Sequence, residues 1–282
     1  MYRLIVENMK GEKLELTNNP AYTIISIDGL YPSSATINTN TMSNMDGERF
    51  NSSRVNKKNI VIELVVESPA EENRIKLYQY IKTKQYIKLY YENEARKVYI
   101  EGRVESMPIQ FFEMKQKVQI SIICPSPFFR NVENTVVNFS SVIDLFEFPF
   151  SIAEEGIPFS ELKLGVEKSI VNNGDVEDGV IIELVATGLV LNPKIYNSGT
   201  YEHFFLNIEM QAGDKITINT RKGEKGVVLF KDGIETNIIS KMAIGSSWFQ
   251  LQPGNNAFIY EADEYPENLS CIFIQTNLFE GV

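Results

Sequence analysis

The sequence is poor in the residue types that most often carry chemistry. Its 282 residues include one histidine, His203, one tryptophan, Trp248, and two cysteines. It has no glycine-rich phosphate loop, no Gly-x-Ser-x-Gly nucleophile elbow, and no cluster of histidine, cysteine and carboxylate residues at metal-ligand spacing. A nucleophilic triad needs a base, and a zinc site needs nitrogen or sulfur ligands close together. These absences argue against an enzyme, a metal and a cofactor, and favour a scaffold or binding protein.

The cysteines, Cys124 and Cys271, lie in opposite halves of the chain, each on or beside an apolar run. A disulfide between them stays open, but two buried reduced thiols are favoured. No run approaches the ~20 apolar residues of a membrane span, and Met1–Glu7 lacks the long apolar core of a signal peptide. We therefore expect a protein that is made in a cytoplasm and does not associate with membranes.

The chain is acidic, with a formal net charge of −10 at pH 7 and a pI of about 4.9. Affinity for nucleic acid depends mainly on lysine and arginine side chains that neutralise phosphates. Specific binding to DNA or RNA is therefore not expected, although an acidic wall past which DNA slides is compatible with this charge. The chain length and the 43% of hydrophobic residues predict about two domains, each with a core of its own.

The first domain, predicted over residues 1–131, is a β-sandwich-like domain with one helix. Its apolar residues alternate with the period of half-buried strands, as at Tyr2, Leu4 and Val6. Further strands are predicted at Lys13–Leu16, Tyr22–Ile27, Asn59–Val66, Tyr86–Tyr91, Lys97–Ile100 and Gln116–Ile123.

A single helix is predicted after Ser68, where Ser68-Pro69-Ala70-Glu71 supplies an N-cap, a proline at the first helical position and a glutamate three residues on. Ile75, Tyr78 and Ile81 then recur at helical spacing to about Lys84. We expect this amphipathic helix to lie on the sheet, with those three side chains in the core.

A polar segment, Ser33–Lys58, interrupts the first domain and contains the turn Met45-Asp46-Gly47-Glu48. An Asp-Gly turn between polar runs is typical of an extended β-hairpin arm that projects from the core. A surface loop without regular structure is the alternative. Long excursions of this kind in a compact domain tend to be functional or disordered.

The second domain, predicted over residues 132–282, has short strands separated by turns rich in glycine and asparagine. Regular turn-bounded strands without a helix predict an antiparallel β-sandwich. The turns are Asn172–Asp175, Asp178–Gly179, Ala212–Asp214, Asp232–Gly233 and Pro253–Asn256, and the strands between them include Gly179–Val185, Phe204–Ile208, Ile216–Thr220, Val227–Phe230 and Ala257–Glu261.

Three features of the second domain could carry chemistry. The acidic run Asp175–Gly179 looks like a calcium loop, but Gly174 and Val176 occupy places where the first ligands belong, so a solvated turn is favoured. His203 is most simply a strand residue with a structural hydrogen bond. Trp248 could stack on a sugar if exposed, which makes it a weak carbohydrate candidate; a core tryptophan is commoner in a sandwich.

Read in order, the first half resembles the siphophage distal tail protein family. The segments that carry the resemblance are Ile27–Leu30, Asp46–Phe50, Asn59–Ile60, Arg74–Tyr78, Ile87–Tyr91 and Gln119–Phe128. The second half is similar to the galectin-like domain of that family through the turns given above and the closing Glu280–Val282. The likeness covers nearly the whole chain, although no single motif is specific.

The resemblance implies a structural protein of the virion tail tip or baseplate, made in the cytoplasm of a bacterial host. It implies a homo-hexameric ring between the tail tube protein and a hub protein of the tail tip, of the tail-associated lysin type, with DNA passing through the ring. The second domain mounts peripheral proteins such as a receptor-binding protein. The arm reaches a neighbouring subunit, and its candidate contact residues are Asn40, Met42, Met45, Arg49 and Phe50.

Two other functions stay open. One is a carbohydrate-binding or receptor-recognition module of a tail, and the other is the hub of a phage-like bacteriocin. Galectins read galactose with His-x-Asn-x-Arg and Trp-x-x-Glu-x-Arg strands. Here His203 and Trp248 lack those partners, since the positions two residues after His203 and three after Trp248 hold Phe205 and Leu251. The fold resemblance therefore supplies no sugar site, and a glycan hydrolase has no positive support.

We accordingly expect the second domain to lack lectin activity, because discrimination of sugars needs polar groups placed in a groove. Trp248 should be mainly buried, with blue-shifted fluorescence that added sugars leave unchanged. A specific hit on a glycan array that Trp248→Ala abolishes would contradict this expectation.

Overall fold

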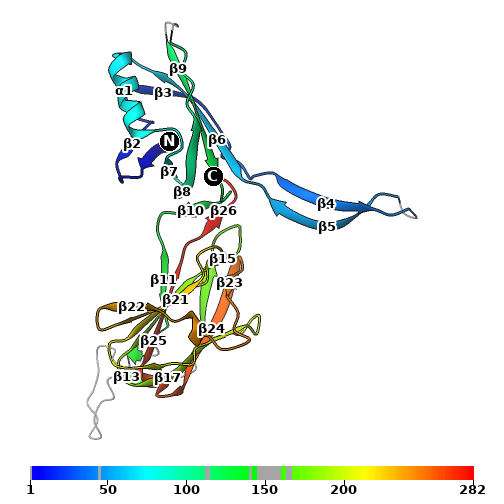
Figure 1. The fold of residues 1–282 in the computed structure, drawn as a ribbon, viewed down its shortest axis with the longest axis vertical. Coiled ribbons are helices and arrows are strands. Elements are labelled where there is room, and N and C mark those ends of the chain that lie inside the picture. Colours follow the sequence, from blue (N-terminus) through cyan, green and yellow to red (C-terminus); the bar gives the residue numbers. More distant parts are fainter. Residues whose placement is uncertain (1, 44–45, 112–114, 140–141, 145–159, 163–166) are drawn as a thin grey trace, which may run out of the picture. The chain divides into compact units, whose positions relative to one another are not determined.

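The computed structural model describes the chain except for residues 1, 44–45, 112–114, 140–141, 145–159 and 163–166 (Figure 1). The chain divides into two compact units. Unit 1 comprises Met1–Val132 and Leu278–Val282, and unit 2 comprises Glu133–Asn277. The assignment of the last five residues to the second domain is therefore wrong. They return to unit 1 because β26 (Leu278–Phe279) pairs antiparallel with β10 (Phe129–Asn131).

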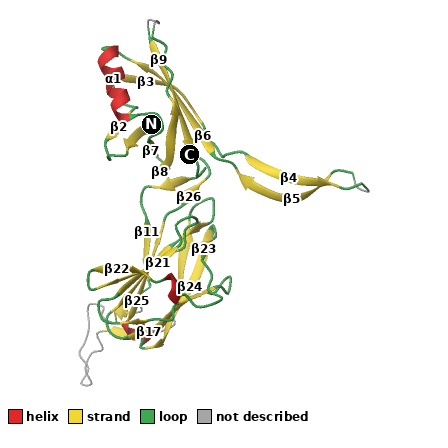
Figure 2. Cartoon of the chain, in the orientation of Figure 1, coloured by secondary structure: helices red, strands yellow, loops and turns green. Residues whose placement is uncertain are grey.

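The fold class is confirmed as mostly β, and Figure 2 shows strands throughout both units. The described residues contain one α-helix, α1 (Ala70–Tyr80), and two short 3-10 turns, η1 (Ile239–Lys241) and η2 (Pro266–Asn268). None of the helices in the described part of the chain is long and apolar enough to span a membrane.

Unit 1 is built on one antiparallel sheet of nine strands. Seven of them lie in the order β2-β1-β7-β8-β9-β6-β3, and β10 pairs with β8 and β26. Their bounds are β1 (Arg3–Asn8), β2 (Lys13–Glu15), β3 (Tyr22–Asp28), β6 (Lys58–Val66), β7 (Tyr86–Glu92), β8 (Lys97–Ser106) and β9 (Gln116–Cys124). Each predicted strand of the first half is found at these places.

The alternation in the sequence forms the core of unit 1. Leu4 and Val6 are fully buried, while their neighbours in β1 are only part-buried or exposed. Leu14 in β2 and Tyr22 in β3 belong to the same buried cluster although their strands lie at opposite ends of the sheet order. One buried cluster therefore extends from one end of the sheet order to the other, as expected for the sandwich-like form that the sequence predicts.

The helix lies where it is predicted, but it ends at Tyr80 and not near Lys84, and its cap and its buried face differ. Pro69, not Ser68, is the N-cap, with an extended ψ of 108° and no side-chain hydrogen bond. Leu77 and Ile81 are buried, whereas Ile75 is exposed. The helix begins one residue later than the Ser-Pro signal indicates, because Pro69 has extended backbone. The buried face of the helix is the one that contains Leu77.

The polar segment forms a hairpin arm and not an irregular loop. β4 (Ala35–Thr41) and β5 (Glu48–Val55) pair antiparallel as a two-stranded sheet of their own. Gly47 in the connection has φ of +87°, a conformation that glycine adopts without steric cost. The predicted hairpin is thus confirmed.

Unit 2 is a sandwich of two antiparallel sheets. The first contains β11 (Thr135–Asn138), β25 (Leu269–Gln275), β16 (Ile181–Ala186), β20 (Lys215–Asn219), β21 (Gly226–Lys231) and β22 (Ile234–Asn237), in that order. The second contains β14 (Lys168–Asn172), β24 (Gly254–Glu264), β17 (Val190–Asn197) and β18 (His203–Phe205), with β19 (Glu209–Met210) beside β17. Two small pairs are β12 (Val142–Asp144) with β13 (Ser160–Leu162), and β15 (Asp178–Gly179) with β23 (Gln250–Leu251).

Aromatic side chains join the two sheets of unit 2. The ring centroids of Phe258 in β24 and Phe273 in β25 lie 4.9 Å apart, and the ring centroid of Phe139 lies 4.5 Å from that of Phe273. All three rings are at most 1% exposed. Such contacts between inward faces are what hold a β-sandwich together. The more specific likeness to a galectin stays a prediction.

Both cysteines are free and buried, as favoured from the sequence. Burial raises the pKa of the Cys124 thiol to about 12 and also raises that of Cys271. Because the thiolate is the reactive form of cysteine, a raised pKa makes both thiols unreactive near neutral pH.

We expect neither thiol of the folded protein to react with Ellman's reagent at about pH 8, and both to react in guanidinium. The comparison is the time course of thiol release under the two conditions. An Asn38→Cys variant, whose thiol would lie on the exposed arm, is the positive control. Labelling of the native cysteines as fast as in denaturant would contradict their burial.

Candidate subunit interface on the arm of unit 1

The arm leaves nearly all of its side chains in water. Every residue of β5 is exposed, and so are six of the seven in β4. Large apolar side chains are among them, with Ile37 at 64% and Phe50 at 61% of their full accessible surface. A two-stranded hairpin is marginally stable at best in water, and an exposed apolar patch commonly marks an interaction site. The arm therefore has the properties of a segment that another surface covers.

The strand register sorts the side chains of the arm into two faces, because paired residues point to the same side of a sheet. Ala35 pairs with Val55, Ile37 with Ser53 and Thr39 with Phe50. We call Ala35, Ile37, Phe50 and Val55 the apolar face. Opposite it lies the basic face, made of Thr36, Asn38, Asn40, Arg49, Ser52 and Arg54.

A β-bulge creates this division. The register shifts between the pairs Asn38–Ser52 and Thr39–Phe50, so that Asn51 has no partner residue. Without the shift, Phe50 would lie opposite Asn40 and point to the basic face. The extra residue moves Phe50 to the side of Ile37.

Side-chain hydrogen bonds agree with the two faces. On the basic face, Asn38 Nδ2 donates to Ser52 Oγ at 3.0 Å, and Thr36 Oγ1 donates to Asn56 Oδ1 at 2.8 Å. On the other side, Thr39 Oγ1 donates to the Glu48 carboxylate. Each bond joins residues of one face across the hairpin and supports the register.

The structure thus separates the contact residues predicted for the arm. Phe50 belongs to the apolar face, whereas Asn40 and Arg49 are cross-strand partners on the basic face. Met42 lies just beyond β4 and is exposed. Met45 falls outside the described residues.

A buried lysine, which the sequence reading missed, anchors the arm where it joins the sheet. Lys58 is 3% exposed, and its Nζ donates to the carbonyl oxygens of Tyr31 at 2.5 Å and Glu280 at 3.1 Å. The same Nζ lies 5.1 Å from the ring centroid of Phe129. Desolvation by burial lowers the pKa of Lys58 from its ordinary value. A signal was present, because Lys58 is in phase with Ile60, the next inward residue of β6.

The last residues of the sequence complete this anchor. Arg96 Nη1 donates to Gly281 O at 2.5 Å, and its guanidinium lies 4.3 Å from the Phe279 ring centroid. The Val282 amide donates to Leu30 O at 3.1 Å. Leu30 and Tyr31 precede the arm and Lys58 follows it, so residues 278–282 bind both of its ends.

The two candidates in unit 2 lie close together. Trp248 is half-buried; its ring meets Phe204 edge-on at 5.3 Å, and Lys225 Nζ lies 5.7 Å from its centroid. His203 lies in β18, as expected, with its ring 4.4 Å from Phe205 and its carbonyl accepting from the Ser247 amide.

The acidic turn of unit 2 is occupied by protein contacts. Asp178 is buried and its Oδ1 accepts from the Gly179 amide at 2.8 Å, while Glu177 pairs with Lys222 at 2.5 Å. Across the described residues, no three His, Cys, Asp or Glu side chains come close enough to hold a metal ion.

Two family models match the chain, one for each unit. The phage tail protein RIFT-related domain matches residues 9–124, and the C-terminal domain of siphovirus-type tail components matches residues 173–270. The chain belongs to the siphophage distal tail protein family. A search of curated proteins gave no match.

Solved structures show the same fold over the whole distal tail protein. The crystal structure of SPP1 Dit, described as a paradigm of the hub adsorption apparatus in phages that infect Gram-positive bacteria, has a TM-score of 0.70 at 13% identity, covering 99% of both chains. Chains from the phage P2 baseplate in its activated conformation have TM-scores of 0.57 with Ca and 0.54 with Sr, at 15% identity and 100% coverage of both chains. Family membership makes this chain a structural component of the virion tail.

Replacing Lys58 tests the anchor of the arm. Lys58→Met leaves the carbonyl groups of Tyr31 and Glu280 without their donor, and an unpaired buried polar group costs roughly 1–3 kcal/mol. We expect the free energy of unfolding of the isolated protein to fall by about that amount in urea titrations, and proteolysis near Tyr31 to become faster.

Lys57→Met is the matched control, because Lys57 is the adjacent residue and is exposed. Its effect should stay within about 0.5 kcal/mol, as for most surface substitutions. Equal stability and equal proteolysis of the two variants would show that Lys58 does not hold the arm.

Proposed function

We propose that this chain is the hub of a siphophage tail end, a homo-hexameric ring that joins the tail tube protein to the tail tip or baseplate. Unit 1 builds the ring, and each arm lies on a neighbouring subunit. Phages assemble their tails in the bacterial cytoplasm, where this chain is made. The observation that carries the proposal is an ordered hairpin, in a member of the distal tail protein family, whose side chains find almost no cover in their own chain.

Unit 2 serves in this proposal as the mounting point for peripheral proteins, such as a receptor-binding protein. It carries 21 acidic and 9 basic residues, whereas unit 1 carries 16 acidic and 18 basic ones. The negative charge of the chain therefore belongs to unit 2, and a partner mounted there meets an acidic surface.

The same division of charge changes the argument about DNA. The counts of acidic and basic residues in unit 1 are nearly equal, so a ring built by unit 1 is close to neutral. The net charge of the whole chain therefore does not give the charge of the wall of the ring. We propose that DNA passes through the ring and that a tail-associated lysin-type hub protein lies below it. Membership of the family supports both proposals, and charge supports neither.

The oligomeric mass tests the ring. Light scattering on the full chain at tens of micromolar should give six times the 32.1 kDa of one subunit, or a multiple of that for stacked rings. Replacing Asn40–Phe50 by a short Gly-Ser turn should give monomers, because the covered part of the arm is gone.

Circular dichroism and urea unfolding provide the control for folding, since the sheet of unit 1 does not include the arm strands. Rings that survive the shortened arm would refute its role between subunits. A wild-type chain that stays monomeric at these concentrations would count against the ring.

A further inference from the structure

We infer that the arm docks on a second copy of this chain through its apolar face, and that the receiving surface is the region around Ile25 on strand β3. This inference rests on the proposed function and deepens it by naming both sides of the contact. The basic face of the arm then points away from the receiving surface.

The arm supplies a short apolar stripe on one side only. Val55 and Ala35 form one pair, Ile37 follows two residues along β4, and Phe50 lies opposite Thr39 beyond it. At ~3.3 Å per residue the stripe from Ala35 to Thr39 is roughly 13 Å long. No large apolar side chain among the described arm strands points to the basic face. A hairpin of this pattern can bury one face and leave the other in water.

The bulge in β5 argues that this arrangement is functional. It leaves one residue of the hairpin without a partner, and bulges commonly re-aim a side chain at a functional surface. Here the side chain that it re-aims is Phe50, the largest in the arm strands. A regular hairpin would divide Ile37 and Phe50 between opposite faces, and neither face could then bury both.

The receiving surface lies on the last strand of the sheet order of unit 1. Ile25 in β3 is 51% exposed, and it too sits at a register shift, between the Ile24 and Ser26 pairs with β6. An edge strand presents backbone groups without a partner and is a common place for another chain to pack. Natural proteins usually protect such edges with charge or with a covering segment.

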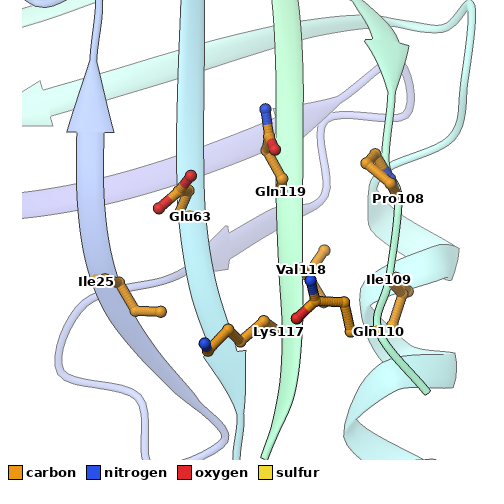
Figure 3. A pocket seen from close by; sticks show the side chains of 8 residues that line it. All are labelled: Ile25, Glu63, Pro108, Ile109, Gln110, Lys117, Val118 and Gln119. Carbon is orange, nitrogen blue, oxygen red and sulfur yellow. The ribbon is translucent and has the colours of Figure 1, made fainter. Parts of the chain in front are cut away.

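Two hollows meet at Ile25. Figure 3 shows the first, of about 310 Å³, where Ile25 faces Pro108 and Ile109 across β6 and β9. The second, of about 260 Å³, lies on the other side of Ile25 and is lined by Tyr2, Ile27, Leu30 and Tyr91 among others. Apolar side chains on both sides of Ile25 match a stripe that carries Ile37 and Phe50.

Charge favours a copy of this chain as the occupant. Glu63 is exposed and lines the first hollow with Ile25, together with Lys117, and it accepts from Ser26 Oγ at 3.0 Å; Asp28 is exposed three residues further along β3. The arm brings Arg49 and Arg54, whose long stems can pass around the edge of a two-stranded sheet and place their guanidinium groups at the rim. An apolar centre with opposite charges at its border is the usual composition of a specific interface.

Cysteine crosslinking tests the contact, because both native thiols are buried. Rings of the unmodified chain are first established by light scattering. The variant with Phe50→Cys and Ile25→Cys is then treated with a short bis-maleimide and run on a denaturing gel. We expect covalent oligomers up to the size of the ring.

The matched control combines Asn38→Cys with Ile25→Cys. Asn38 is exposed and lies on the basic face of the same hairpin, so this pair should stay at least tenfold less crosslinked. Gln119→Cys, in the first hollow, replaces Ile25→Cys if loss of the isoleucine prevents rings from forming. A second readout is ring dissociation on dilution: Phe50→Ser should raise the midpoint concentration at least tenfold and Asn38→Ser less than threefold.

Crosslinking through Asn38 and not Phe50 would show that the arm docks by its other face and would overturn the inference. Intact rings in which neither pair crosslinks would place the arm on another surface or another protein, with the same consequence. Both results leave the ring itself standing. A chain that never forms rings removes the proposed function, and this contact with it.

Discussion

A β-hairpin with both faces in water buries too little apolar surface to stabilise its own shape. The arm of this distal tail protein is such a hairpin, and it depends on two things outside itself. At one end it needs a fixed root in unit 1, and along its length it needs a surface to lie on. The root is visible within one chain, whereas the surface that we propose for the apolar face lies on a second copy.

The root explains why the chain returns to unit 1 after unit 2. Unit 2 is inserted in the sequence between β10 and β26, which are paired strands of unit 1. The residues after β26 supply carbonyl groups to Lys58 and Arg96 and an amide to Leu30. The closing segment therefore has a structural role, since its hydrogen bonds join the segment that leads into the arm to the segment that leads out of it.

The sequence predicted the arm as a segment but not as a surface. The Asp-Gly turn and the polar composition of Ser33–Lys58 indicated a hairpin, with an irregular surface loop as the alternative. The sequence could not predict which side chains of the arm share a face. A single unpaired residue, Asn51, exchanges the faces of the β5 side chains that lie between it and the turn. In unit 2, likewise, the turns predicted a sandwich, while the surroundings of Trp248 include Phe204 from β18 and Lys225 from the turn before β21, both distant in the sequence.

By itself the sequence predicted the fold class, the strands of the first half, several strands of the second half and the one α-helix of the described residues, because these follow from local periodicity and composition. It favoured reduced cysteines but left a disulfide open. The tertiary structure decided the features that arise from pairing between distant residues. Lys58 is a core residue only because Tyr31 and Glu280 offer it carbonyl oxygens. Leu278–Val282 belong to unit 1 only because β10 has a free side for β26. Pairing of this kind is set by the three-dimensional neighbours of a residue, which its sequence neighbours do not specify.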